Sequence, residues 1–179
     1  MGGTLAWESW LERFIRQTVV QLEREAVVSD RSAFTDDEWK ALTEAPLRMT
    51  LALVTVSKHN PISVVKEATA SARAIAHPTE PGPAHDLITE IAREAESRES
   101  RHDVKAHLGQ TPQEIVDHAL ADLAPAAHAL DQLSTDEAAG VRAWLVDIAN
   151  AVVATSKSPT SEEDDVLAKI ANVFGASAT

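Results

Sequence analysis

The chain has 179 residues, contains no cysteine and carries a formal net charge of −12. Without cysteine it can form no disulfide, thiolate zinc site or cysteine nucleophile, and this composition fits a cytoplasmic protein. The net negative charge argues against a nucleic-acid partner, because phosphates require a stripe of lysine and arginine. No segment approaches the roughly 18 apolar residues of a membrane span, and residues 1–7 lack the basic region of a signal peptide.

Apolar residues recur at intervals of three and four, and not in the alternating pattern of a strand. This period predicts an all-α fold, and the chain length fits a single helical domain over residues 1–179. We expect about seven helices, which include two related helix–turn–helix units and a separate N-terminal helix.

The first predicted helix, Leu5–Val28 within an N-terminal region of residues 1–30, is amphipathic. Its apolar face carries Trp7, Trp10 and Phe14. Acidic and basic residues nearly balance along it, which argues against an anionic membrane surface. Two interpretations remain open. The helix packs on its own bundle, or it docks on a second copy or a partner protein, because Trp and Phe clusters commonly anchor interfaces.

The first helix–turn–helix unit is predicted over residues 34–76. The motif Thr35-Asp-Asp-Glu38 has the spacing of a capping box before a helix over 36–56. Pro46 should kink this helix or mark a fresh start within it. A second helix is expected over 61–76, with proline at its first position.

The middle of the chain, residues 77–110, is predicted to contain a loop, one helix and a charged connector. Three prolines and a glycine mark residues 77–83 as the loop, and residues 96–110 are dense in charge, which indicates a mobile connector. Residues 111–133 then begin with a capping box and a proline at the first helical position, and Pro125 should bend or divide that helix.

The second unit is predicted over residues 134–179. It starts with another capping box, Ser134-Thr-Asp-Glu137, which opens a helix over 135–155. A last helix is expected from about Pro159 to Phe174, and Gly175 should end it.

The two units repeat one pattern 99 positions apart. Thr35 corresponds to Ser134, and Ser57-Lys58 corresponds to Ser156-Lys157. The inward apolar face is kept at this spacing, with Leu42, Pro46, Met49 and Leu53 matching Val141, Leu145, Ile148 and Val152. The alternative is that any two antiparallel helix pairs align this well, because capping motifs and apolar spacing are generic.

The segment Phe34-Thr-Asp-Asp-Glu-Trp-Lys-Ala-Leu-Thr-Glu-Ala-Pro46, with the apolar helix and short turn after it, resembles a group of uncharacterised bacterial helical proteins. These in turn look like the tellurite-resistance TerB fold. The resemblance covers residues 34–76 and 134–174, and it implies two helix–turn–helix units around a shared core and a stress-related role. In that family each turn typically carries Asp-Gly with an acid about six positions later, and the pattern is suspected of binding metal.

This chain departs from the family pattern at both turns. Lys58 and Lys157 stand where the turn aspartate should be, and a protonated ammonium cannot ligate a cation. One interpretation is that each lysine replaces a metal as the positive centre, so that Lys58 pairs with Glu67 and Lys157 with Asp164. The other is a solvated lysine at a helix C-terminus, where the helix dipole favours cations.

A second candidate for chemistry is the stripe formed by Glu114, His118 and Asp122, whose four-residue spacing places them on one side of a helix. Such a stripe could offer ligands to a divalent metal, and the alternative is an ordinary polar face. The chain has no Gly-x-Ser-x-Gly motif and no glycine-rich phosphate loop, so no catalytic residue or cofactor is assigned. We therefore expect a non-enzymatic helical interaction or assembly module. The alternative is a divalent-metal-binding or hydrolytic protein that uses His118 with neighbouring carboxylates.

Overall fold

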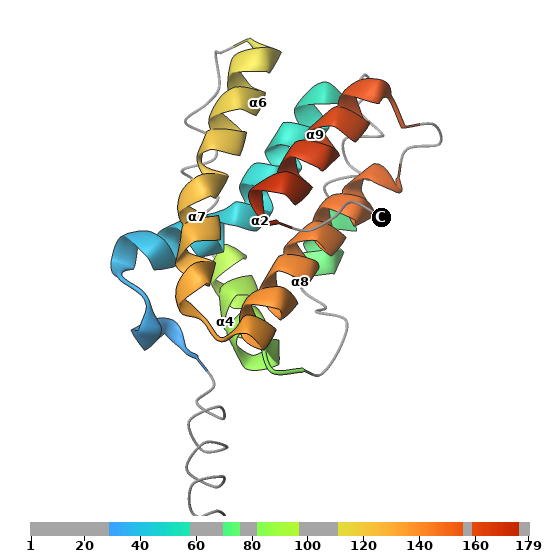
Figure 1. Cartoon of the computed structure of the whole chain (residues 1–179). Helices are drawn as coiled ribbons and strands as arrows, with labels where there is room; N and C mark the ends of the chain where they lie inside the picture. The colour runs from blue at the N-terminus through green and yellow to red at the C-terminus, as the bar shows by residue number, and fades with distance from the viewer. Residues whose placement is uncertain (1–28, 58–69, 76–81, 97–110, 156–158, 176–179) are drawn as a thin grey trace, which may run out of the picture.

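The structure is a computed structural model, and it describes residues 29–57, 70–75, 82–96, 111–155 and 159–175. The described residues are mostly helical and contain no strand, which confirms the predicted all-α class. Six α-helices and two 3-10 turns have both ends within the described residues, and residues 70–75 are helical as well; Figure 1 shows their arrangement. In chain order they are η1 (Arg31–Ala33), α2 (Asp36–Val56), α4 (His85–Ala95), α6 (Pro112–Ala121), α7 (Leu123–Ala129), η3 (Leu130–Gln132), α8 (Thr135–Val153) and α9 (Ser161–Val173).

None of the helices in these ranges is both long enough and apolar enough to cross a membrane.

Helix α2 is the element on which the bundle is built, since it packs against α4, α6, α7, α8 and α9. It begins after Thr35 with both hydrogen bonds of the predicted capping box, and it ends at Val56 as expected. Pro46 lies buried inside it, and the blue and cyan halves of the helix run in different directions in Figure 1. Because proline cannot donate to the carbonyl of Leu42, the helix bends here without ending.

Pro125 divides the helix that the sequence predicts within residues 111–133. Helix α6 ends at Ala121, Asp122 lies between the two helices, and Pro125 sits in the first turn of α7. Proline cannot donate to the carbonyl of Ala121, and its ring crowds that carbonyl, so the break falls before the proline itself. The break places Asp122 at the junction of α6 and α7.

Helices α8 and α9 begin with capping boxes. Helix α8 starts at Thr135 after Ser134, as predicted. Helix α9 starts at Ser161, close to the predicted start at about Pro159, and the side chain of Thr160 caps it. Gly175 follows the end of α9 with a φ of 65°, a left-handed conformation that favours glycine.

The buried faces of α2 and α8 match at the predicted spacing. Leu42, Pro46, Met49 and Leu53 are buried on α2, and their counterparts Val141, Leu145, Ile148 and Val152 are buried on α8. The turns after these helices, at residues 58–69 and 156–158, lie outside the described residues. The repetition of the complete helix–turn–helix units therefore stays a prediction, while the matching of the two faces is confirmed.

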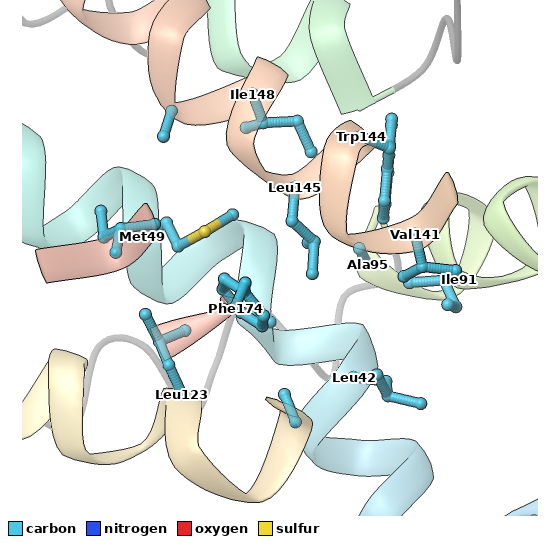
Figure 2. Close-up of a cluster of buried hydrophobic side chains, with 14 of the residues drawn as sticks. Leu42, Met49, Ile91, Ala95, Leu123, Val141, Trp144, Leu145, Ile148 and Phe174 are labelled. Carbon is cyan, nitrogen blue, oxygen red and sulfur yellow. The ribbon is translucent and has the colours of Figure 1, made fainter. Parts of the chain in front are cut away.

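The core is continuous across all the α-helices of the described bundle. Met49, Leu123 and Phe174 meet where α2, α7 and the end of α9 converge, and Ile91 and Val141 meet where α4 lies beside α8 (Figure 2). Each of these side chains is at most 1% exposed. Full burial of a side chain of this size contributes about 1.5–3 kcal/mol to stability, so this region is the main source of cohesion.

Helix α4 approaches α8 closely at a glycine. A Cβ atom added to Gly140 would lie 2.7 Å from the Cβ of Ala84, which precedes α4 and is 3% exposed. Carbon atoms of side chains do not approach this closely, so the absence of a side chain at position 140 sets the distance between the two helices.

Candidate functional site

The structure gives Glu114 and Asp122 of the predicted metal stripe separate partners. Glu114 closes the capping box of α6, where its Oε2 accepts the backbone N–H of Thr111 at 2.8 Å and the Thr111 hydroxyl at 2.8 Å. Hydrogen bonds from Thr111, chiefly its backbone N–H, lower the pKa of Glu114. His118 lies exposed on α6, and Asp122 faces α2. Within the described ranges, no three His, Asp or Glu side chains are grouped so as to hold a metal ion.

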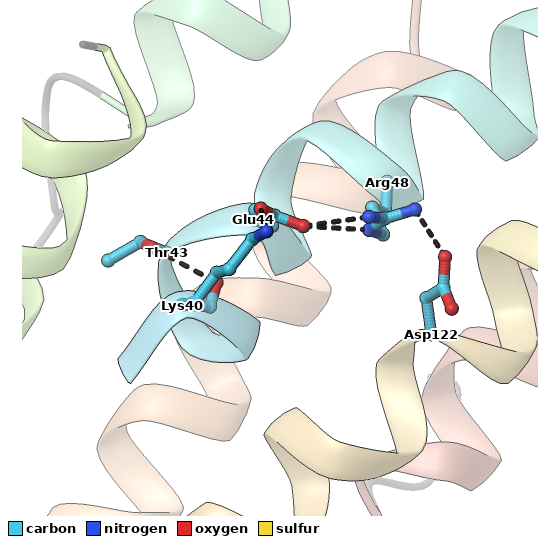
Figure 3. Close-up of polar contacts among 5 residues, drawn as sticks. All are labelled: Lys40, Thr43, Glu44, Arg48 and Asp122. Carbon is cyan, nitrogen blue, oxygen red and sulfur yellow. Dashed lines mark hydrogen bonds and ion pairs between the residues drawn. The ribbon is translucent and has the colours of Figure 1, made fainter. Parts of the chain in front are cut away.

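Asp122 belongs to a chain of ion pairs that joins α2 to the junction of α6 and α7 (Figure 3). The guanidinium of Arg48 pairs with Asp122 on one side and, at 2.7 Å, with Oε2 of Glu44 on the other. Lys40 adds a longer contact of 3.6 Å to Glu44. The side chains of Arg48 and Glu44 are only 13% and 6% exposed, so removing one partner would leave a poorly solvated charge. The cluster thus joins α2 to the α6–α7 junction, a structural role that the sequence spacing did not reveal.

The predicted ion pairs at the two turns lie largely outside the described residues. Lys58, Glu67 and Lys157 lie outside the described residues, and Asp164 is exposed on the first turn of α9. The buried acid of this turn is the preceding residue, Glu163, which is 1% exposed. The sequence-based prediction placed the acid that pairs with Lys157 one residue later, at Asp164.

Glu163 connects the start of α9 to the end of α2. Its Oε2 accepts the backbone N–H of Thr160 at 2.6 Å, which completes the capping box. Its Oε1 accepts the hydroxyl of Ser57 at 2.6 Å, 106 residues away in the chain. We call this arrangement of Glu163, Thr160 and Ser57 the Glu163 clamp. One carboxylate therefore serves a local helix start and a long-range contact together.

Glu137 makes the equivalent connection at the start of α8. Its Oε2 accepts the hydroxyl of Ser134 at 2.7 Å, and its Oε1 accepts the backbone N–H of Ser29 at 2.7 Å. The hydroxyl of Ser29 donates to Oε2 at 3.2 Å. We call Glu137, Ser134 and Ser29 the Glu137 clamp. The side chain is buried, with Glu137 4% exposed, yet all of these bonds favour its ionised form.

Burial and hydrogen bonding shift the pKa of Glu137 in opposite directions, and the hydrogen-bond donors decide the result. Burial raises the pKa of Glu137, but hydrogen bonds from the Ser29 backbone N–H, from Ser134 and from the Ser29 hydroxyl outweigh burial and leave the pKa below its usual value. The carboxylate is therefore charged at neutral pH, and charge-assisted hydrogen bonds of this kind are about twice as strong as neutral ones.

A groove of about 520 Å³ opens between the end of α2, the start of α6 and the start of α9. Val116 and Val166 form its apolar floor, and Glu162, Asp165 and Lys169 stand along its α9 side. The described residues that line it include no histidine.

A second hollow, of about 460 Å³, lies beside the end of α9. Arg142 donates to Asp131 at 2.8 Å there, and Nδ1 of His128 lies 3.6 Å from the same carboxylate. The side chain of His128 is 83% exposed and that of Asp131 63%. Ion pairs this exposed contribute about 0–1 kcal/mol, and the water around them weakens any electrostatic stabilisation of a reacting group.

Comparisons of the chain with protein-family models, with curated proteins and with solved structures found no match.

Proposed function

We propose that the protein is a non-enzymatic assembly module that associates with a second copy through the aromatic face of its N-terminal segment. The observation that carries the proposal is that four acidic side chains already make hydrogen bonds or ion pairs that hold the fold together. Glu114 caps α6, Asp122 pairs with Arg48, and Glu137 and Glu163 hold serines from distant parts of the chain. Carboxylates committed in this way support architecture and leave the aromatic segment as the feature with the clearest capacity for binding.

The distribution of aromatic residues supports the same proposal. The chain has three phenylalanines and four tryptophans. Four of the seven, Phe34, Trp39, Trp144 and Phe174, are buried in the core and at most 8% exposed. The other three are Trp7, Trp10 and Phe14 of the N-terminal segment, which lies outside the described residues. Large aromatic side chains of this kind dominate the binding energy of protein interfaces.

Sedimentation of the full chain over a range of concentrations tests the proposal. We expect the wild type to self-associate and the triple variant Trp7→Ala, Trp10→Ala, Phe14→Ala to remain a monomer. A matched control, Glu8→Ala, Glu12→Ala, Glu23→Ala, changes the opposite face of the predicted helix and should associate like the wild type. A wild type that stays monomeric at all concentrations would contradict the proposal, and so would a triple variant that associates normally.

The metal-binding alternative has its own test. A stoichiometric divalent metal in the purified protein that is lost in His118→Ala would contradict the non-enzymatic proposal and support a metal site that uses His118. We expect no such loss, because the stripe's two carboxylates are bonded to Thr111 and Arg48.

The cellular setting of the proposal comes from the sequence alone. We place the protein in the cytoplasm of a bacterium because it lacks cysteine and resembles bacterial TerB-like proteins, and we assign it to a stress response on that resemblance. Unchanged growth of a strain without the gene, under tellurite and oxidative stress, would contradict the assignment.

A further inference from the structure

Helix α6 is the least buried α-helix of the described bundle. Two of its ten residues are buried, Val116 and Ala119, whereas α9, the next lowest, buries four of thirteen. The other α-helices bury larger shares of their residues. An element with few buried apolar contacts needs less free energy to open locally while the rest of the protein stays folded. Helix α6 is therefore the α-helix of this bundle that detaches most easily.

A joint at Asp122 separates α6 from a firmly anchored neighbour. Leu123, the first residue of α7, is 0% exposed and belongs to the core shown in Figure 2. Pro125 has no N–H to donate to the carbonyl of Ala121, so the hydrogen-bond ladder is interrupted between the two helices. A rotation at Asp122 can therefore displace α6 while α7 stays in place.

The joint itself is held against α2 by Arg48 (Figure 3). The Nε and Nη2 groups of Arg48 both donate to Oε2 of Glu44, at 3.2 and 2.7 Å, which fixes the guanidinium on α2. Its remaining nitrogen, Nη1, donates to the carboxylate of Asp122. A guanidinium held in this way offers Asp122 a fixed partner, so the ion pair favours one position of the joint.

Helix α6 covers apolar surface at its other end. Val116 of α6 and Val166 of α9 both line the groove between α2, α6 and α9, yet they are only 2% and 3% exposed. The groove therefore offers hardly any of its valine surface while α6 lies in this position. Moving α6 away from α9 would uncover both side chains together.

We propose that α6 is a hinged lid, which opens about Asp122 while α7 stays anchored and thereby exposes Val116 and Val166. The ion pair between Arg48 and Asp122 favours the closed position. The lid is independent of the proposed self-association, because its parts belong to the bundle and not to the N-terminal segment. Any group that binds these valines has to bind the open state, so its apparent affinity is limited by the open fraction.

Thiol labelling can measure the opening, because in a chain without cysteine only introduced thiols react. Val116→Cys and Val166→Cys report the lid, and Val152→Cys on α8, which is 1% exposed, is the matched control for a buried valine. Each folded variant is treated with iodoacetamide at one pH, and its rate is divided by the rate of the same variant unfolded in urea. Where opening and closing are faster than the reaction, this ratio measures the open population.

We expect similar ratios for Val116→Cys and Val166→Cys, both more than about tenfold above the ratio for Val152→Cys, because a local opening costs less free energy than global unfolding. Equal ratios for Val116→Cys and Val152→Cys would overturn the proposal, since α6 would then open only with the whole bundle. A Val166→Cys ratio as low as that of Val152→Cys would also overturn it, since α6 would then not cover α9. Ala119→Cys, at a second buried position of α6, replaces Val116→Cys if that variant fails to fold.

A second substitution tests the hinge contact. Asp122→Ala should raise the ratios of Val116→Cys and Val166→Cys about fivefold, because the ion pair that favours the closed lid is lost. Asp131→Ala is the matched control, since it removes the partner of Arg142 away from the joint and should leave both ratios unchanged. Unchanged ratios in Asp122→Ala, or an equal rise in Asp131→Ala, would contradict the role of Asp122 as the hinge contact.

Discussion

The helix starts at Thr111 and Thr160 use the same local hydrogen bonds but differ in their surroundings. In each, a glutamate three residues later accepts the backbone N–H of the threonine, at 2.8 Å for Glu114 and 2.6 Å for Glu163. Glu114 is exposed, whereas Glu163 is 1% exposed and also holds Ser57. A capping box in the sequence therefore predicts where a helix starts, while burial decides whether the glutamate of that box also contacts a distant element.

The largest loss of stability is expected on substitution of Glu163, the buried glutamate of this pair. Glu163→Ala removes the acceptor of two half-buried donors, the Ser57 hydroxyl and the Thr160 backbone N–H. Hydrogen bonds to charged groups contribute about 1.5–3 kcal/mol each, so we expect a loss of about 3 kcal/mol or more in unfolding free energy. Urea denaturation measures it. Glu114→Ala is the matched exposed variant and should lose clearly less. Equal losses would show that burial does not distinguish the two boxes.

A second test sets local helix propensity against tertiary contact at Gly140. Propensity alone predicts that Gly140→Ala stabilises α8 by about 1 kcal/mol. The 2.7 Å approach to the Cβ of Ala84 predicts the opposite, a net loss of about 1–3 kcal/mol from overpacking. Thermal melting measures the sign. In an Ala84→Gly background the crowding atom is absent, so Gly140→Ala should then stabilise; if it still destabilises, the contact with Ala84 is not the cause.

Acid should weaken the Glu137 clamp. The pKa of Glu137 is lower in the folded protein than the unfolded value of about 4.3, so the unfolded chain binds more protons and stability falls as the pH falls through the folded pKa. Glu137→Gln removes this group. We therefore expect the stability advantage of the wild type over Glu137→Gln to be full above about pH 5 and to shrink as the pH falls through the folded pKa of Glu137, as followed by urea denaturation at each pH. A constant advantage would mean that the carboxylate is not ionised in the clamp.

The smallest losses of unfolding free energy are expected for substitution of Ser57 and Ser29, the long-range serines of the two clamps. Ser57→Ala removes the 2.6 Å bond to Glu163, with an expected loss of about 1.5 kcal/mol. Ser29→Ala keeps the 2.7 Å backbone bond to Glu137 and removes only the 3.2 Å hydroxyl bond, with an expected loss of about 0.5 kcal/mol or less. Chemical denaturation of both variants checks the order, and a reversed order would contradict the assigned donors.

Local features of the fold were predictable from the sequence. The ends of α2, the capping box of α8 and the buried faces of both helices follow from spacing and end signals, because these depend on neighbours within about one helical turn. The start of α9 was predicted only approximately, at about Pro159, because the sequence signal did not single out Thr160 as the cap before Ser161. The break before Pro125 follows from its clash with the carbonyl of Ala121, four residues back.

The candidate sites were less predictable, because they depend on residues far apart in the chain. Arg48 and Asp122 are 74 positions apart, and Ser29 and Glu137 are 108 apart. Hydrophobic periodicity predicts which face of each helix is buried. It does not predict which other helix that face contacts, or at which position along that helix. The spacing of Glu114, His118 and Asp122 therefore indicated a shared stripe, whereas the packing of α2 gave Asp122 to Arg48.

Hydrogen exchange of four backbone amides tests the central comparison most directly, without any substitution. The N–H groups of Thr35, Thr111, Thr160 and Ser29 all donate to a glutamate carboxylate, at 2.6–2.8 Å. If burial turns a capping glutamate into a clamp, the amides of Thr160 and Ser29 exchange only when the clamps open and are strongly protected, while those of Thr35 and Thr111 exchange quickly. Protection of Thr160 and Ser29 no greater than that of Thr111 would contradict the account.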